Sequence, residues 1–172
     1  MADDFPLDTD ESKTLSSWSP GPVDCSEDLA RLIYRDEQLD VQTGEIKIGA
    51  FPLEDVVRPE RGGWSLCRLK YSSESAIRSK GELFEQRHPD NKFRGVSVGC
   101  TRSIREISIP DGSGKRPILV VDDGLPDDPS HCLIKQVLLA PATSRSEIRA
   151  QKAKLKPVRE QVWKLFSPLT AV

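Results

Sequence analysis

The chain has 172 residues, of which 37% are hydrophobic and 30% charged, and its formal net charge is −2 at pH 7. This length allows one ordinary domain with tails, and the small net charge gives no overall field that favours nucleic acid or a membrane. The first residues, MADDFPLD, lack the basic and apolar parts of a secretory signal. Since no apolar run approaches the roughly 20 residues of a membrane span, we expect a cytoplasmic protein with no membrane partner.

Potential metal ligands are few and scattered. The chain has four cysteines and two histidines, and no cysteine lies within four residues of another. A closed zinc site would therefore need ligands from distant parts of the sequence. In a reducing compartment the thiols stay free, and most free cysteines behave as small core residues. We expect no metal site and no cofactor.

Charge and periodicity divide the chain into three parts. Residues 1–24 are acidic, rich in Ser, Pro and Asp, and without hydrophobic periodicity, which predicts a disordered acidic tail. Residues 25–142 hold most of the apolar patterns and predict the folded domain. Residues 143–172 are basic and predict a helical extension.

Short segments of the central part alternate apolar and polar residues, which is typical of half-buried strands. Residues 27–34 also suit a helical turn after Ser26, and residues 104–109 either continue the strand before them or begin a new one. Ser73 is expected to cap one main helix from Glu74 to about Arg87. The pattern predicts an α+β fold, a single domain with a mixed sheet of five or six short strands. The candidate strands lie near residues 32–34, 46–50, 64–71, 95–100, 104–109, 118–121 and 133–139.

The basic C-terminal segment predicts an amphipathic helix that begins at the Ser144–Glu147 capping box and is broken or restarted at Pro157. Its apolar stripe suits docking on the domain itself or on a protein partner. Its cations suit the phosphates of a nucleic acid, which do not require the stripe. We therefore favour docking, and the candidate partner-binding residues are Val158, Val162, Trp163 and Phe166.

A polar loop follows the apolar run 118–121 and delivers His131. Four carboxylates in such a loop suit either a hard cation or, more simply, a solvated turn. His131 is a candidate general base if an acid from the loop, Asp123 or Asp128, orients it; the alternative is that His131 only holds the loop together. The next residue, Cys132, should face the opposite side of a strand, so these two do not form a nucleophile–base pair. The loop acids are Asp122, Asp123, Asp127 and Asp128.

Three arginines near predicted strand ends, Arg68, Arg102 and Arg105, could bind an anion, and we take Arg68 and Arg102 as the candidate anion-binding residues. Three patterns in the chain resemble those of small uncharacterised bacterial proteins: GEIK followed by AF in residues 44–51, SLCRL in residues 65–69, and LPDDPSH in residues 125–131. This resemblance implies a bacterial setting and draws attention to His131 and Arg68, but it implies no activity.

Three functions remain in view. The first is a non-catalytic accessory protein that binds another protein in a bacterial cytosolic assembly. The second is a small enzyme that acts on a phosphate-containing substrate, with His131 and Asp123 as catalytic residues and an arginine as the anion site. The third is a nucleic-acid-associated protein that uses the basic C-terminal helix.

Overall fold

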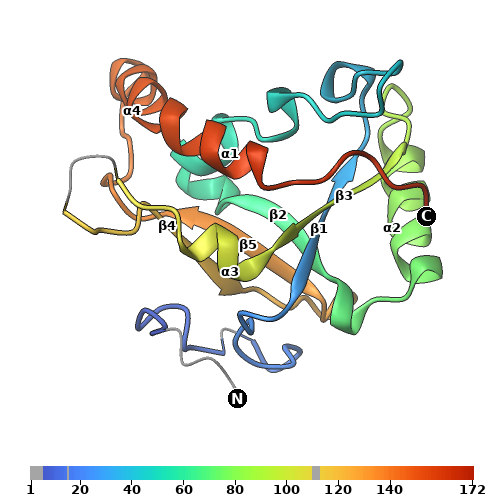
Figure 1. The fold of residues 1–172 in the computed structure, drawn as a ribbon, viewed down its shortest axis with the longest axis horizontal. Coiled ribbons are helices and arrows are strands. Elements are labelled where there is room, and N and C mark those ends of the chain that lie inside the picture. Colours follow the sequence, from blue (N-terminus) through green and yellow to red (C-terminus); the bar gives the residue numbers. More distant parts are fainter. Residues whose placement is uncertain (1–5, 15, 110–112) are drawn as a thin grey trace.

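The computed structural model describes residues 6–14, 16–109 and 113–172. Among them are five strands, four α-helices and four short 3-10 helices (Figure 1). In chain order they are β1 (Asp28–Ile33), η1 (Asp36–Gln38), η2 (Ile48–Ala50), α1 (Glu54–Val57), η3 (Pro59–Arg61), β2 (Trp64–Arg68), η4 (Leu69–Tyr71), α2 (Glu74–Arg87), β3 (Gly95–Cys100), α3 (Thr101–Arg105), β4 (Ile118–Asp122), β5 (His131–Gln136) and α4 (Arg145–Lys164).

The strands form one sheet in the order β3-β1-β2-β5-β4, and each neighbouring pair is antiparallel. The predicted α+β single domain is confirmed, but the sheet is antiparallel where a mixed sheet was expected. The loop 123–130 joins β4 directly to β5, whereas a parallel neighbour would need a crossover of a dozen or more residues. The register pairs Cys67 with His131 and Val121 with Leu133.

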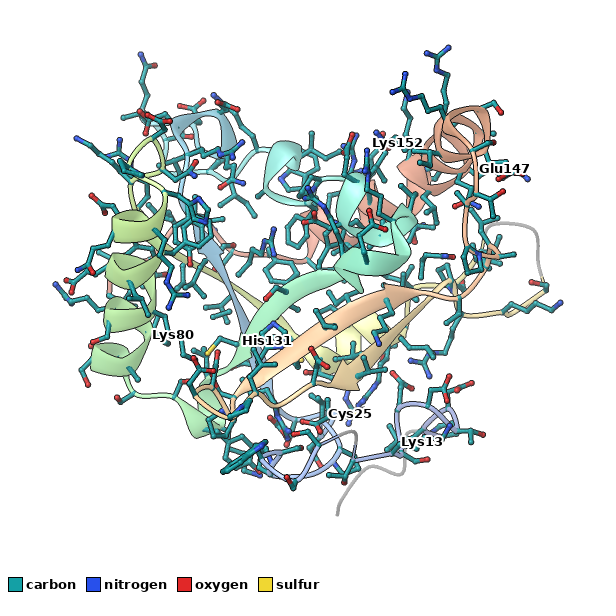
Figure 2. All side chains as sticks on the ribbon, turned by 180° about the vertical axis from the view of Figure 1, so that it is seen from behind. Lys13, Cys25, Lys80, His131, Glu147 and Lys152 are labelled. Atoms are coloured by element: carbon teal, nitrogen blue, oxygen red, sulfur yellow. The ribbon has the colours of Figure 1, made fainter. Side chains whose placement is uncertain are left out.

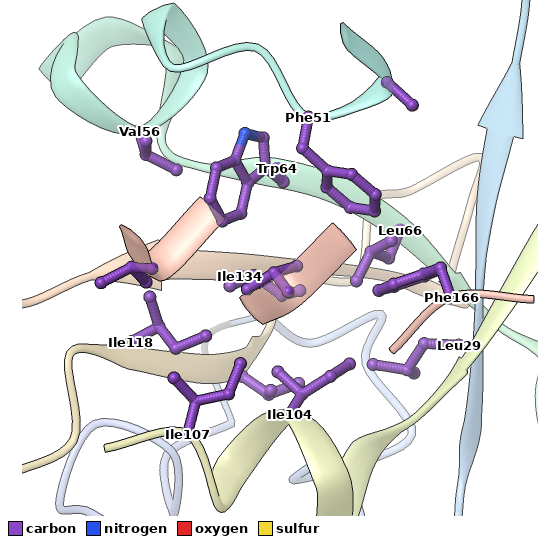
Figure 3. Packing of buried hydrophobic residues seen from close by; sticks show 14 of the residues in the cluster. Leu29, Phe51, Val56, Trp64, Leu66, Ile104, Ile107, Ile118, Ile134 and Phe166 are labelled. Atoms are coloured by element: carbon purple, nitrogen blue, oxygen red, sulfur yellow. The ribbon is translucent and has the colours of Figure 1, made fainter. Parts of the chain in front are cut away.

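One face of the sheet carries the main hydrophobic core, and we call it the core face. Helices α1, α3 and α4 contribute side chains to this cluster, in which Trp64, Leu66, Ile134 and Phe166 are buried (Figure 3). The Phe51 ring lies between two aromatic neighbours, with its centroid 5.6 Å from that of Trp64 and 4.8 Å from that of Phe166. Burial of such large apolar side chains removes apolar area from water and so stabilises this side of the sheet.

The opposite face, which we call the back face, is covered by α2 over β1, β2 and β3. Ile77 of this helix packs with Ala30, Cys67 and Val96. The predicted helix and its cap are confirmed, because Ser73 Oγ accepts a hydrogen bond from the backbone of Ala76 at 3.2 Å. On β4 and β5 the same face holds a smaller buried cluster of Leu119, Val121 and Leu133.

Two of the candidate strands take other forms. Residues 48–50 form η2, and Ile46 makes only an isolated bridge with Leu39. Residues 101–105 form α3, in which Ile104 is fully buried and Ile107 follows at 6% exposure. A spacing of three residues places two side chains on one face of a helical turn, which explains how both isoleucines reach the core.

The described residues before β1, 6–14 and 16–27, lie against the edge of the sheet (Figure 1). Glu11 is completely buried: its carboxylate accepts hydrogen bonds from the side chain of Arg105 at 3.0 Å and from the backbone N–H of Val120 at 2.8 Å. Arg116 donates two further bonds to the same carboxylate. Burial by itself raises the pKa of Glu11, but the bonds from Arg116 and Val120 and the charge of Arg105 outweigh it, so this pKa is lowered. A residue expected in a disordered tail therefore accepts hydrogen bonds from the edge strand β4 and from a buried guanidinium.

Helix α4 begins at the predicted capping box and continues through Pro157 to Lys164. Its apolar side chains on both sides of the proline pack on the core face, which holds the two halves in line. After the helix, Thr170 exchanges two backbone hydrogen bonds with Val96 and so extends the sheet beyond β3. None of the helices in the described part of the chain has the length and apolar character that crossing a bilayer requires.

Candidate functional site

A group of polar side chains lies on the back face beside α2, where this helix no longer covers the sheet (Figure 2). Ser65 and Cys67 alternate with core residues of β2 and therefore point to the back face. His131 begins β5 opposite Cys67, which makes it the diagonal neighbour of Ser65. We call the group the polar centre; its members are Ser65, Cys67, Ser72, Lys80, Asp123, Asp128, Ser130 and His131.

His131 is held through both ring nitrogens. Its Nε2 lies 2.6 Å from Ser65 Oγ. Its Nδ1 lies 3.0 Å from the carbonyl oxygen of Asp123 and 3.1 Å from Oδ2 of the same residue. The order hydroxyl, imidazole, carboxylate is the arrangement in which an imidazole takes a proton from a serine while an acid orients the ring. Of the two loop acids considered for His131, the structure brings Asp123 to its ring, whereas Asp128 lies beside Lys80.

Lys80 binds the other half of the polar centre from α2. Its Nζ lies 2.5 Å from Asp128 Oδ1 and 2.8 Å from Ser130 Oγ. Ser130 Oγ also donates to Asp128 and lies 3.0 Å from Cys67 Sγ. Ser130 is buried at 1% exposure, whereas the side chain of Lys80 is 26% exposed. The ammonium and carboxylate neutralise each other, so this half of the centre offers no unpaired cation.

The loop carboxylates diverge instead of gathering. Asp122 points to the core face and lies 3.3 Å from a nitrogen of Arg68, while Asp123 turns to His131 and Asp128 to Lys80. Across residues 6–14, 16–109 and 113–172, no three His, Cys, Asp or Glu side chains come together as a metal ion would need. Within the 123–130 loop, Asp123 and Asp128 thus each lie beside one basic side chain, whereas Arg68 contacts both Asp122 and Glu27.

Arg68 lies inside the protein at 1% exposure. Its guanidinium makes a two-bond ion pair with Glu27, at 2.6 and 2.8 Å, and also donates to the carbonyl of Gly21 at 2.6 Å. Burial works to lower the pKa of Arg68, but the pairing with Glu27 outweighs it and the pKa is raised. Arg102 lies in α3, where its backbone N–H donates to Cys25. The structure thus places Arg68 in an internal ion pair and brings neither arginine into the polar centre.

The apolar residues predicted for partner binding, on α4 and just after it, pack on their own domain. Val158, Val162 and Phe166 are at most 7% exposed, and the Trp163 ring N–H donates to the carbonyl of Ile46 at 2.7 Å. The sequence left open whether the apolar stripe of α4 docks on its own domain or on a protein partner, and in the structure it contacts its own domain. Val158, Val162 and Phe166 would become accessible to a partner only if α4 and the residues after it left the sheet, whereas Trp163 is partly exposed.

Cys132 points away from His131 into the core, as the strand alternation predicts. Burial raises the pKa of its thiol strongly, so it stays protonated and unreactive. All four cysteines are free thiols. A surface recess in the described part of the chain is lined by Tyr34, Asp36, Asn91 and Arg94, among others, and shares no residue with the polar centre.

Sequence reasoning missed Ser65, Lys80 and Ser130. The alternation of Ser65 and Cys67 with core residues was visible and predicts that both face away from the core. Their meeting with His131 depends on β2 lying beside β5, which no local pattern indicates. No sequence pattern marked Lys80 as a member of the polar centre, because a lysine on a helix is normally solvent-exposed.

No known protein family, curated protein or solved structure matches this chain.

Proposed function

We propose that the protein is an accessory protein that binds another protein in the bacterial cytoplasm. The observation that carries this proposal is that three large apolar side chains are exposed on segments that contact one another near the 123–130 loop. Trp18 is 55% exposed, Tyr71 41% and Leu125 40%, and we call these three the loop-end patch. Large aromatic side chains left in solvent are enriched at protein interfaces, where they carry much of the binding energy.

Hydrogen bonds fix the segments that carry this patch against one another. Ser16 Oγ donates to the carbonyl of Gly124 at 2.5 Å, so the turn that holds Trp18 lies beside Leu125. Arg68 connects Tyr71 to the segment that carries Trp18. Its guanidinium lies 4.6 Å from the ring centroid of Tyr71 and also donates to the carbonyl of Gly21. The patch is therefore held in shape before any partner arrives, which reduces the entropy lost on binding.

The charge beside the patch suggests the character of the partner. Asp24 and Asp127 are exposed next to the segments that carry Trp18 and Leu125. The pKa of Asp24 is lowered, first by hydrogen bonds from Ser26, so this carboxylate is charged at neutral pH. A partner segment with apolar side chains flanked by lysine or arginine would match this surface.

Capture from a native lysate with matched variants tests the proposal. Trp18→Asp and Leu125→Asp place charge in the patch, and both should release a protein that the wild type retains. Val41→Asp is the control, because Val41 is 73% exposed and lies in the 40–44 loop, outside the patch. Equal retention by all four proteins, or equal loss with Val41→Asp, would contradict the proposal.

One observation favours nucleic acid as a second candidate. Because α4 buries its apolar face in its own domain, its cations Arg149, Lys154 and Lys156 are left exposed. Replacing these three by alanine should flatten the dependence of log affinity on log salt by about one unit for each phosphate that is no longer neutralised. A triple change of exposed lysines elsewhere provides the control: Lys47, Lys92 and Lys115. If both triple variants bind duplex as the wild type does, α4 is not a phosphate-binding surface.

A further inference from the structure

We propose that Ser65, His131 and Asp123 form a hydrolytic site for neutral acyl esters, with Ser65 as the nucleophile. The three side chains come from β2, β5 and the 123–130 loop, and they meet in the order that nucleophilic serine catalysis requires. Ser65 Oγ is 2.6 Å from Nε2, and Asp123 Oδ2 is 3.1 Å from Nδ1. The proposal goes beyond partner binding, because it assigns a reaction to the polar centre.

Each member has the exposure that its role needs. Ser65 is exposed on the back face, so a substrate carbonyl can approach Oγ from solvent. The His131 side chain is 15% exposed and the Asp123 side chain 34%, so the orienting acid is partly shielded while the hydroxyl is open. A serine that served only to hold His131 would gain more from burial, because solvent competes for an exposed hydrogen bond.

The reaction follows from these positions. Ser65 Oγ adds to the ester carbonyl carbon while its proton passes to Nε2 of His131, and the carbonyl oxygen becomes an oxyanion. The oxyanion collapses, the bond to the leaving alcohol breaks, and the imidazolium returns the proton to the leaving oxygen, which leaves Ser65 acylated. A water then adds to the acyl carbon and gives a proton to Nε2, and that proton returns to Oγ as the carboxylic acid leaves. Throughout both halves Asp123 orients the ring and stabilises the imidazolium.

The surroundings favour acyl esters over phosphate esters. The nearest cation in the polar centre, Lys80, is neutralised by Asp128 at 2.5 Å. Arg68, one of the arginines expected to bind an anion, is buried in its ion pair with Glu27. Phosphoryl transfer relies on cations that stabilise the charged oxygens, and neither group is free to do so. The open position of Ser65 favours an acyl group displayed on a surface or at the end of a flexible chain.

Covalent labelling of the full chain tests the assignment. A fluorophosphonate should modify the wild type at Ser65, as intact mass and peptide mapping would show, and 4-nitrophenyl acetate should be hydrolysed. Ser65→Ala should lose both, while Ser75→Ala should retain both, since Ser75 is an exposed serine whose hydroxyl lies 2.9 Å from Ser73 Oγ. His131→Gln and Asp123→Asn should each slow labelling, by at least about 100-fold for the histidine, because a general base typically contributes about 10²–10⁴-fold.

The outcomes separate cleanly. If the folded wild type is not labelled at Ser65, the proposal is overturned. It is equally overturned if His131→Gln and Asp123→Asn label at the wild-type rate, since Ser65 would then react without its base. Should His131→Gln fail to fold, Asp123→Asn and Ser65→Ala still decide the matter. With no partner present, Trp18→Asp should label at Ser65 as the wild type does, because it leaves Ser65, His131 and Asp123 unchanged; a failure of the partner-binding proposal would therefore not overturn this one.

Discussion

Replacing Glu11 should destabilise the protein far more than replacing its neighbour Asp10. Glu11 is 0% exposed and pairs with Arg105, whose side chain is equally buried. Asp10 pairs with Lys13 at 2.6 Å, but their side chains are 63% and 53% exposed. Two adjacent acids in one acidic segment thus occupy opposite environments, and Asp10→Ala is a matched control for Glu11→Ala.

The magnitudes follow from the burial. Removing one partner of a buried ion pair leaves an uncompensated charge and costs about 3–5 kcal/mol. An exposed pair contributes about 0–1 kcal/mol. A domain of this size loses about 2–4 °C of melting temperature per kcal/mol. We therefore expect Glu11→Ala to melt at least about 6 °C below the wild type, and Asp10→Ala to melt within about 4 °C of it.

Thermal and urea denaturation followed by circular dichroism measures both variants. The urea slope should not change for Asp10→Ala, because the surface exposed on unfolding stays the same. If Glu11→Ala melts at the same temperature as Asp10→Ala, then Glu11 does not stabilise the edge of the sheet. The disordered tail expected from composition would then describe the protein in solution better than the docked segment does.

Three further changes follow from individual interactions. The pKa of Glu11 is lowered in the fold, so its contribution to the free energy of unfolding is complete above its unfolded pKa of about 4.3. This contribution is lost as pH falls through the folded pKa. Urea unfolding at pH 7, 4 and 3 should therefore show a larger drop in the free energy of unfolding for the wild type than for Glu11→Gln. Gly81→Ala should lower the free energy of unfolding by about 1–3 kcal/mol despite the better helix propensity of alanine, since its Cβ would lie 2.3 Å from the Phe93 ring; urea titration measures this. Gly124→Ala would bring a Cβ within 2.8 Å of the Ser19 backbone, so trypsin should cleave the segment before β1 faster than in the wild type.

Local chemistry was predictable from the sequence. Ser73 and Ser144 lie at the start of their helices because a hydroxyl satisfies a backbone N–H that the first turn leaves free. His131 and Asp123 meet because one short loop separates them, so few conformations keep them apart. The stripe on α4 was equally visible, and only its target was left open.

Interactions between distant segments were not predictable. Glu11 reaches Arg105 across 94 positions, and nothing in an acidic stretch marks which carboxylate will be buried. Ser65 meets His131 only because β2 and β5 are neighbours, and that order depends on the packing of the whole sheet. The alternation of Ile46 and Ile48 suited a strand, yet no neighbouring strand was in place to pair with it beyond a single bridge.

The segment before β1 connects the two proposed surfaces. In this segment Ser16 Oγ donates a hydrogen bond to the carbonyl of Gly124, the residue that follows Asp123 in the chain. The same segment carries Trp18 of the loop-end patch. A partner that moved Trp18 would therefore pull on the loop that holds Asp123 against His131. Since one hydrogen-bonded unit carries both the patch and the orienting acid, binding at the patch and reactivity at Ser65 should be coupled through the position of that loop.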